Sequence, residues 1–143
     1  MNAEHELGII ASTRLHMALP VIDLDATVEF YSVIFGLRVL YETKYHGRRF
    51  VMMSFGEHRV SFLECPENVP VTKWVSPSGE NPLHIGFVVE KREDVDRVVL
   101  RCQGHGFRVA ILPREREDVH ERSMSCVDPN GYQVEVYCEA PYG

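Results

Sequence analysis

Two histidines and one glutamate stand in strand-like segments from which their side chains could bind one metal ion. His16 and His84 each occupy the second position of an apolar run. Glu135 lies in the last apolar run, at 133–138, which follows an Asp-Pro-Asn-Gly turn. A carboxylate in an apolar strand is costly to bury unless it is paired or binds a metal. His16, His84 and Glu135 therefore form a candidate metal site.

Two histidines and one carboxylate on one side of a metal leave neighbouring coordination positions open. This facial arrangement is typical of non-haem Fe(II) sites, where O₂ and a chelating substrate both need a position. The same ligand set can hold Mn²⁺, and Ni²⁺, Co²⁺ or Zn²⁺ remain alternatives, because ligand geometry alone does not select the metal. We therefore expect a divalent metal cofactor, with Fe(II) as the favoured metal, and a small-molecule substrate.

The 143-residue chain has the composition of a globular protein, with 45% hydrophobic and 25% charged residues. Its net charge of −6 disfavours nucleic acids and membranes as partners, because both select for basic surfaces. The apolar runs are shorter than the ~20 residues of a membrane span, and the acidic N-terminus does not read as a signal peptide. Four cysteines without close spacing favour reduced thiols, so we expect a cytoplasmic protein.

Hydrophobic spacing and turn residues predict two helices and eight strands. The first helix is expected at 26–35, between a cap at Asp23 or Asp25 and a stop at Gly36, and the second at 93–102. We expect strands at 15–21, 37–45, 50–55, 59–65, 83–90, 107–112, 123–127 and 133–138. Outside them we expect an N-terminal arm at 1–12, a proline-containing loop at 66–82 and a charged connection at 115–122.

The order of these elements repeats once, as strand–helix–strand–strand–strand, and His16 and His84 lie 68 residues apart in it. A repeat of this size indicates two copies of one unit, neither of which can bury its sheet face alone. We therefore predict an α+β fold with two tandem βαβββ modules, at about 13–66 and 83–139. Together they would form one domain over 13–143, with a cup-shaped eight-stranded mixed sheet.

The repeat assigns the fourth position of a metal site to Ser61, which becomes the counterpart of Glu135 when Val60 is set against Val134. Three strong ligands therefore remain. Glu64 is the nearest carboxylate that could substitute, but it has the opposite strand parity to Ser61. Because successive strand residues point to opposite faces, we expect Glu64 to face away from the site.

This combination resembles the vicinal oxygen chelate superfamily, which includes glyoxalase I, extradiol dioxygenases, methylmalonyl-CoA epimerase and the fosfomycin and bleomycin resistance proteins. The resemblance covers roughly 13–139 and rests on Leu15-His16, Phe30-Tyr31 with Gly36-Leu37, Leu83-His84-Ile85-Gly86-Phe87, and Asp128-Pro129-Asn130-Gly131 with Glu135. It implies that His16, His84 and Glu135 hold the metal. It also implies a homodimer, in which exchanged modules could place His16 and His84 of one site on different subunits.

The resemblance implies a reaction as well. Extradiol dioxygenases use Fe(II) to open a ring that carries two adjacent hydroxyls, and a histidine and a tyrosine beside the metal handle protons. His120 and Tyr137 are the candidate catalytic residues by this analogy. We therefore expect first an Fe(II)-dependent extradiol-type dioxygenase that acts on a small vicinal diol or chelating aromatic.

Two other functions remain open on the same scaffold. One is a glyoxalase-like lyase or isomerase, or a thiol transferase, which would use another divalent metal and no O₂. A glutamate or glutamine occupies the position of Ser61 in glyoxalase I and in the epimerase, so the serine counts against those two activities. The other is a metal-free drug-binding protein of the bleomycin-resistance type, in which the three candidate ligands would be dispensable.

Overall fold

The computed structural model describes residues 14–70 and 83–139. The expected arm at 1–12 and most of the expected loop at 66–82 lie outside these residues. The first part of that loop forms a short 3-10 helix, η1 (Pro66–Asn68). Over the described residues, no helix is long and apolar enough to cross a membrane.

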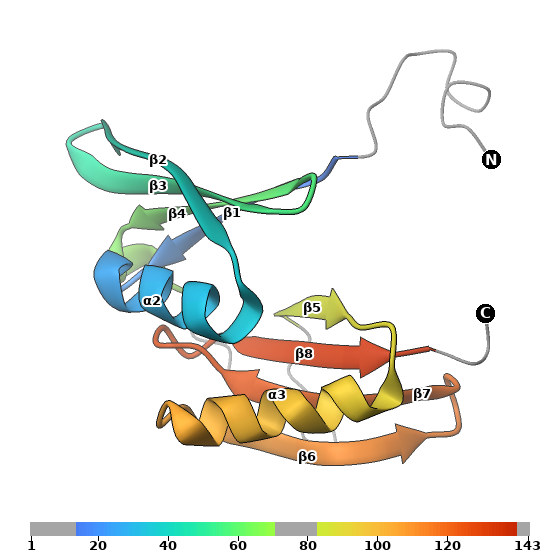
Figure 1. Cartoon of the computed structure of the whole chain (residues 1–143). Helices are drawn as coiled ribbons and strands as arrows, with labels where there is room; N and C mark the ends of the chain where they lie inside the picture. Colours follow the sequence, from blue (N-terminus) through green and yellow to red (C-terminus); the bar gives the residue numbers. More distant parts are fainter. Residues whose placement is uncertain (1–13, 71–82, 140–143) are drawn as a thin grey trace, which may run out of the picture.

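The chain folds as two βαβββ modules, as the repeat predicts (Figure 1). The first module comprises β1 (His16–Val21), α2 (Leu24–Phe35), β2 (Arg38–Tyr45), β3 (Arg48–Phe55) and β4 (His58–Glu64). The second comprises β5 (His84–Val88), α3 (Arg92–Gly104), β6 (Val109–Arg116), β7 (Glu121–Val127) and β8 (Gln133–Cys138). The predicted α+β class and tandem modules are confirmed.

The eight strands form two mixed sheets of four, one for each module (Figure 1). The strand orders are β1-β4-β3-β2 and β5-β8-β7-β6, so the two sheets have the same topology. In each sheet the first strand runs parallel to the last strand of its module, and the other pairs are antiparallel. The two histidine-bearing strands, β1 and β5, are therefore equivalent edge strands.

Helix α2 begins at Leu24, two residues before the predicted start, and ends at Phe35 as predicted, with Asp23 as the cap of the two that the sequence offered. The Asp23 side chain accepts a hydrogen bond from the backbone N–H of Ala26 at 2.9 Å, which satisfies a free donor of the first turn. Gly36 adopts a left-handed φ of 72° at the C-terminal cap, where a residue with a Cβ would be strained. This helix therefore has both of its ends encoded locally.

The expected charged connection at 115–122 is wrong at both ends. β6 continues to Arg116, and β7 begins at Glu121, so only four residues separate the two strands. Arg116 pairs with Glu121 across the strands, and Nη1 of the arginine lies 3.3 Å from Oε1 of the glutamate. This opposite-charge pair stabilises the ladder, so the polar residues extend the hairpin instead of ending it.

The core lies where the two helices meet the inner faces of the sheets, and it crosses the boundary between the modules. α2 buries Phe30 and Ile34 completely, and α3 buries Val95 and Cys102. All four cysteines are buried free thiols. Ring stacking of Phe35 on Phe87, with centroids 4.1 Å apart, joins α2 to β5. The two modules are therefore packed as one body.

The Asp-Pro-Asn-Gly turn before β8 joins the second module to the first. The Tyr31 hydroxyl donates to Oδ2 of Asp128 at 2.8 Å. The Asn130 amide donates to the Thr27 hydroxyl at 3.0 Å, and its Oδ1 accepts from the Ile22 backbone N–H at 2.7 Å. Because these bonds connect residues about one hundred positions apart, the turn is a structural joint as well as the start of a strand.

Candidate metal centre

His84 and Glu135 lie together on adjacent parallel strands of the second sheet. In the register of β5 and β8, His84 pairs with Gln133 and Gly86 pairs with Glu135. Nε2 of His84 lies 2.9 Å from Oε2 of Glu135, and the two side chains are 35% and 16% exposed. Strand alternation directs both side chains to the sheet face opposite the core residues Ile85 and Val134.

The first module repeats this geometry with a weaker partner. Ala18 pairs with Ser61 in the register of β1 and β4, as Gly86 pairs with Glu135 in the second module. Nε2 of His16 lies 3.1 Å from the Ser61 hydroxyl oxygen. The structural equivalence of Ser61 and Glu135 that the repeat predicts is therefore confirmed.

Glu64 faces away from this site, as its strand parity predicts. One carboxylate oxygen of Glu64 accepts a hydrogen bond from the backbone N–H of Leu24 at 2.9 Å. The carboxylate therefore satisfies a donor in the first turn of α2, where the helix dipole also favours a negative charge. Glu64 therefore stabilises the start of α2 and does not supply a fourth metal ligand in place of Ser61.

A single chain brings together two of the three predicted ligands. His84 and Glu135 share the second sheet, whereas His16 lies on the first. Among the described residues, no group of three histidine, cysteine, aspartate or glutamate side chains is close enough to bind one ion. Of the three predicted ligands, the described structure therefore places only His84 and Glu135 within contact of each other.

The donor atoms of the pair fit a metal. Nitrogen and oxygen ligands at about 2.1 Å from an ion and about 90° apart are about 3 Å from each other. The 2.9 Å between His84 Nε2 and Glu135 Oε2 matches this separation. Imidazole and carboxylate are also the two ligand types that a facial non-haem iron site uses.

Glu121 is a buried carboxylate beside the pair that the sequence interpretation missed. Only 8% of the residue is exposed. Burial raises the pKa of Glu121, the neighbouring Glu135 raises it further, and the Arg116 guanidinium partly opposes the rise. The alternation Glu121-Ser123-Ser125 signals that these polar residues share one strand face, but the misplaced start of β7 concealed it.

Tyr137 lies on the same face of β8 as Glu135, two residues further along. Burial raises the pKa of Tyr137, and the carboxylates of Glu139, Glu121 and Glu135 add to the rise. A Cβ added to Gly86 would lie 3.4 Å from a ring carbon of this tyrosine, so its ring covers the backbone of β5. The phenol therefore remains a protonated hydrogen-bond donor close to the pair.

His120 occupies an exposed position in the turn between β6 and β7, with a left-handed φ of 54°. It immediately precedes Glu121 at the start of β7. The predicted acid–base role of His120 stays a prediction.

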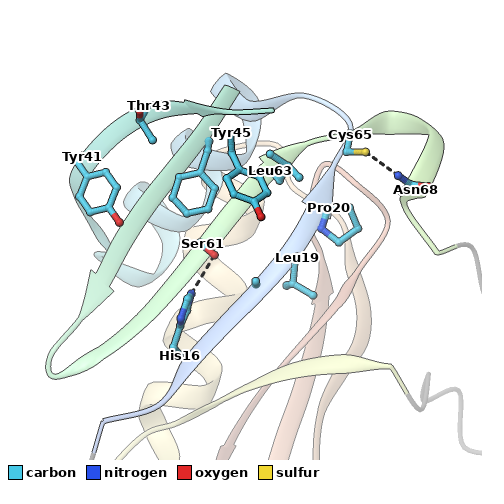
Figure 2. A pocket seen from close by; sticks show the side chains of 12 residues that line it. His16, Leu19, Pro20, Tyr41, Thr43, Tyr45, Ser61, Leu63, Cys65 and Asn68 are labelled. Atoms are coloured by element: carbon cyan, nitrogen blue, oxygen red, sulfur yellow. Dashed lines mark hydrogen bonds between the residues drawn. The ribbon is translucent and has the colours of Figure 1, made fainter. Parts of the chain in front are cut away.

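The first sheet, which carries His16, has a pocket with a volume of about 670 Å³. Figure 2 shows His16 and Ser61 at one end, Cys65 and Asn68 at the other, and aromatic side chains between them. The lining residues come from β1, β2, β3, β4, η1 and the residue between β4 and η1: His16, Ala18, Leu19, Pro20, Tyr41, Thr43, Tyr45, Phe50, Ser61, Leu63, Cys65 and Asn68. The pocket therefore adjoins one predicted metal ligand directly.

Residues 13–136 match the Glyoxalase family, the Glyoxalase/Bleomycin resistance protein/Dioxygenase superfamily. The uncharacterized protein PA2024 of Pseudomonas aeruginosa is 28% identical over 94% of each chain. Lactoylglutathione lyase GLX1 of Arabidopsis thaliana is 27% identical over 89% of this chain, and metapyrocatechase of Pseudomonas sp. is 24% identical over 84%. The alignments span 44% and 37% of those two longer proteins.

Solved structures show the same fold. The fosfomycin resistance protein FosX of Listeria monocytogenes superimposes with a TM-score of 0.71 at 20% identity, over 94% of this chain and 98% of FosX. A mutant of that protein has been solved with Mn(II) and dihydroxypropylphosphonic acid, and it superimposes with the same TM-score.

Proposed function

Because the chain belongs to the Glyoxalase/Bleomycin resistance protein/Dioxygenase superfamily, we propose that it is a metal-dependent enzyme whose site is completed by a second copy. His84 and Glu135 of one chain and His16 of the partner chain would bind one divalent ion. The observation that carries this proposal is the 2.9 Å pair of His84 and Glu135, together with the position of His16 on the equivalent edge strand of the other sheet.

The reaction we propose is oxidative cleavage of a small chelating aromatic, with Fe(II) as the metal. Three protein ligands leave adjacent positions open, because Ser61 replaces a fourth strong ligand. The pocket beside His16 has aromatic walls, and none of its described lining residues is a lysine or arginine that would hold a phosphonate. Sequence similarity to metapyrocatechase points to the same chemistry.

The roles of the protein groups follow from their positions. Bound Fe(II) would supply the centre that activates O₂ and a vicinal diol. The walls of the pocket orient the ring of the substrate and exclude water from it. Tyr137 holds a proton at its phenolic oxygen beside Glu135, and the carboxyl of Glu121 can accept or return a proton on the same face.

A lyase or isomerase that uses another divalent metal is the second candidate. The similarity to lactoylglutathione lyase GLX1 favours it, as does the carboxyl group of Glu121, which could remove a proton from carbon without O₂. The serine at position 61 opposes it, since that position then lacks a carboxylate or amide ligand.

Metal content and oxygen uptake distinguish these functions. We expect protein purified anaerobically without a histidine tag to contain near-stoichiometric iron, and to consume O₂ when a catechol is added. O₂ consumption should stop when a chelator removes the metal. Turnover of a hemithioacetal with Ni²⁺ or Zn²⁺ and no O₂ uptake would support the lyase instead. If no metal binds in any titration, only the metal-free binding protein remains among the candidate functions.

Ser61→Glu tests the equivalence of the two modules. The substitution places a carboxylate beside His16 at the position that Glu135 occupies beside His84. We expect metal affinity to rise by roughly tenfold or more, because a fourth ligand joins the site, and O₂-dependent turnover to fall at least tenfold, because an open position is lost. Ser61→Ala is the control for loss of the hydroxyl beside His16, and it should not raise the metal affinity, because it adds no ligand. Unchanged metal affinity in Ser61→Glu would mean that the side chain at position 61 does not reach the bound metal.

A further inference from the structure

The two sheets carry opposite chemistry at equivalent positions. The register sets Phe50 opposite Leu63 in the first module and Ser123 opposite Tyr137 in the second, at corresponding distances from Ser61 and Glu135. An aromatic–aliphatic pair in one module therefore replaces a hydroxyl–phenol pair in the other. The metal-side half of the proposed site is polar, and the half contributed with His16 is apolar.

The apolar half is incompletely covered by the protein. Tyr41 and Tyr45 are 48% and 56% exposed, although both rings lie on the wall of the pocket. Their ring centroids lie 6.3 Å and 6.5 Å from that of Phe50 at tilted angles, so the three rings form a loose wall and not a closed stack. An exposed apolar surface of this kind beside a proposed site commonly binds a ligand.

The pocket is larger than one aromatic ring requires. Its volume is about 670 Å³, whereas a cavity of about 150 Å³ accommodates benzene. It extends from His16 to Cys65 and Asn68, which mark its far end in Figure 2. No lysine, arginine, aspartate or glutamate is among the described residues that line it. Its volume and walls therefore suit an uncharged apolar group that extends beyond a single ring.

We infer that the substrate is amphipathic, with a chelating polar head at the metal and an apolar body of about two rings or equivalent length in the pocket of the first module. This inference rests on the proposed function, because His16 connects the pocket to the metal. Tyr41, Tyr45 and Phe50 would contact the apolar body of the substrate. Leu63, which pairs with Phe50 across the strands, would contact it as well. A simple catechol would leave most of the pocket filled with water.

The test uses two metal-independent probes, phenol and 4-phenylphenol, on full-length protein treated with a chelator. Calorimetry should show 4-phenylphenol binding at least tenfold more tightly than phenol. Thr43→Trp fills the pocket from β2 and should lower the affinity for 4-phenylphenol at least tenfold. Lys44→Trp is the matched control, because the side chain at position 44 points to the other face of the same strand. The affinity of this variant for 4-phenylphenol should stay within twofold of the wild-type value.

Equal affinity for the two probes would overturn the inference, and so would a preference for 4-phenylphenol that survives Thr43→Trp. A second variant, Tyr45→Ala, removes part of the wall from an exposed position and should lower the same preference at least threefold. Neither probe is a vicinal diol, and neither measurement uses metal or O₂. The inference about the pocket can therefore fail while oxygen uptake with catechol still supports the proposed function. Conversely, the probes can bind as expected while oxygen uptake is absent.

Discussion

His16→Ala and His84→Ala proteins are each expected to lose metal, and a mixture of the two is expected to regain about a quarter of the wild-type metal content and activity. Loss of a direct ligand should cost more than the roughly 10–100-fold in affinity that loss of an outer partner costs. Random exchange of subunits makes about half of the dimers mixed, and each mixed dimer has one intact site of two. Metal content by mass spectrometry after co-expression measures the recovery.

The physical basis of this recovery is the placement of the ligands on different modules. If His16 of one copy joins His84 and Glu135 of the other, the mixed dimer combines an intact first module with an intact second module in one of its sites. A mixture of His84→Ala with Glu135→Gln is the control. Both changes affect the second module, so no site in that dimer is intact and no recovery is expected. Recovery in the control, or none in the test mixture, would contradict a site shared between chains.

The fold could be predicted from sequence because its signals are local and occur twice. Asp23, one of the two predicted caps, and the stop at Gly36 fix α2, and the last strand was predicted with its observed limits, Gln133–Cys138. The equivalence of Ser61 with Glu135 follows from period-two alternation in aligned strands, and the register bears it out. Such features depend on near neighbours in the chain or on the comparison of one module with the other.

The features that sequence did not predict depend on contacts between distant segments. Glu121 reads as part of a polar connection until pairing with Arg116 places it in a strand, where burial and Glu135 raise its pKa. The separation of His16 from the other two ligands likewise depends on how the modules pack. Nothing in the local pattern around His16 or His84 specifies whether their sheets face each other within one chain.

Only one of the two roles of the turn before β8 could be predicted from the sequence. Asp-Pro-Asn-Gly reads as the start of a strand, and it does begin β8. The turn and the tyrosine that follows it also bind the first module, because Asp128 accepts from Tyr31 and the Tyr132 hydroxyl donates to the Pro20 carbonyl at 2.8 Å. The same residues therefore set the start of the strand that carries Glu135 and the position of that strand relative to β1.

We expect Asp128→Ala to lower the free energy of unfolding by roughly 3–5 kcal/mol. The Asp128 carboxylate is buried and accepts hydrogen bonds from the Tyr31 hydroxyl, the Asn130 backbone N–H and the Tyr132 backbone N–H, at 2.8, 2.8 and 3.0 Å. Burial raises the pKa of Asp128, although these bonds oppose the rise. Alanine would leave all three donors in the interior without an acceptor, and each such donor costs about 1–3 kcal/mol.

Urea unfolding measures this loss, and two further variants identify its cause. Tyr31→Phe removes one donor and keeps the others satisfied, so it should cost only about 1–1.5 kcal/mol. In Asp128→Ala the Tyr31 hydroxyl has already lost its acceptor, so adding Tyr31→Phe should cost less than it does in the wild type. Asp118→Ala is the surface control, because its side chain is 68% exposed, and it should stay within about 0.5 kcal/mol of the wild type. A loss below about 1 kcal/mol in Asp128→Ala would mean that the apolar contacts between α2 and β5 hold the modules together without the turn.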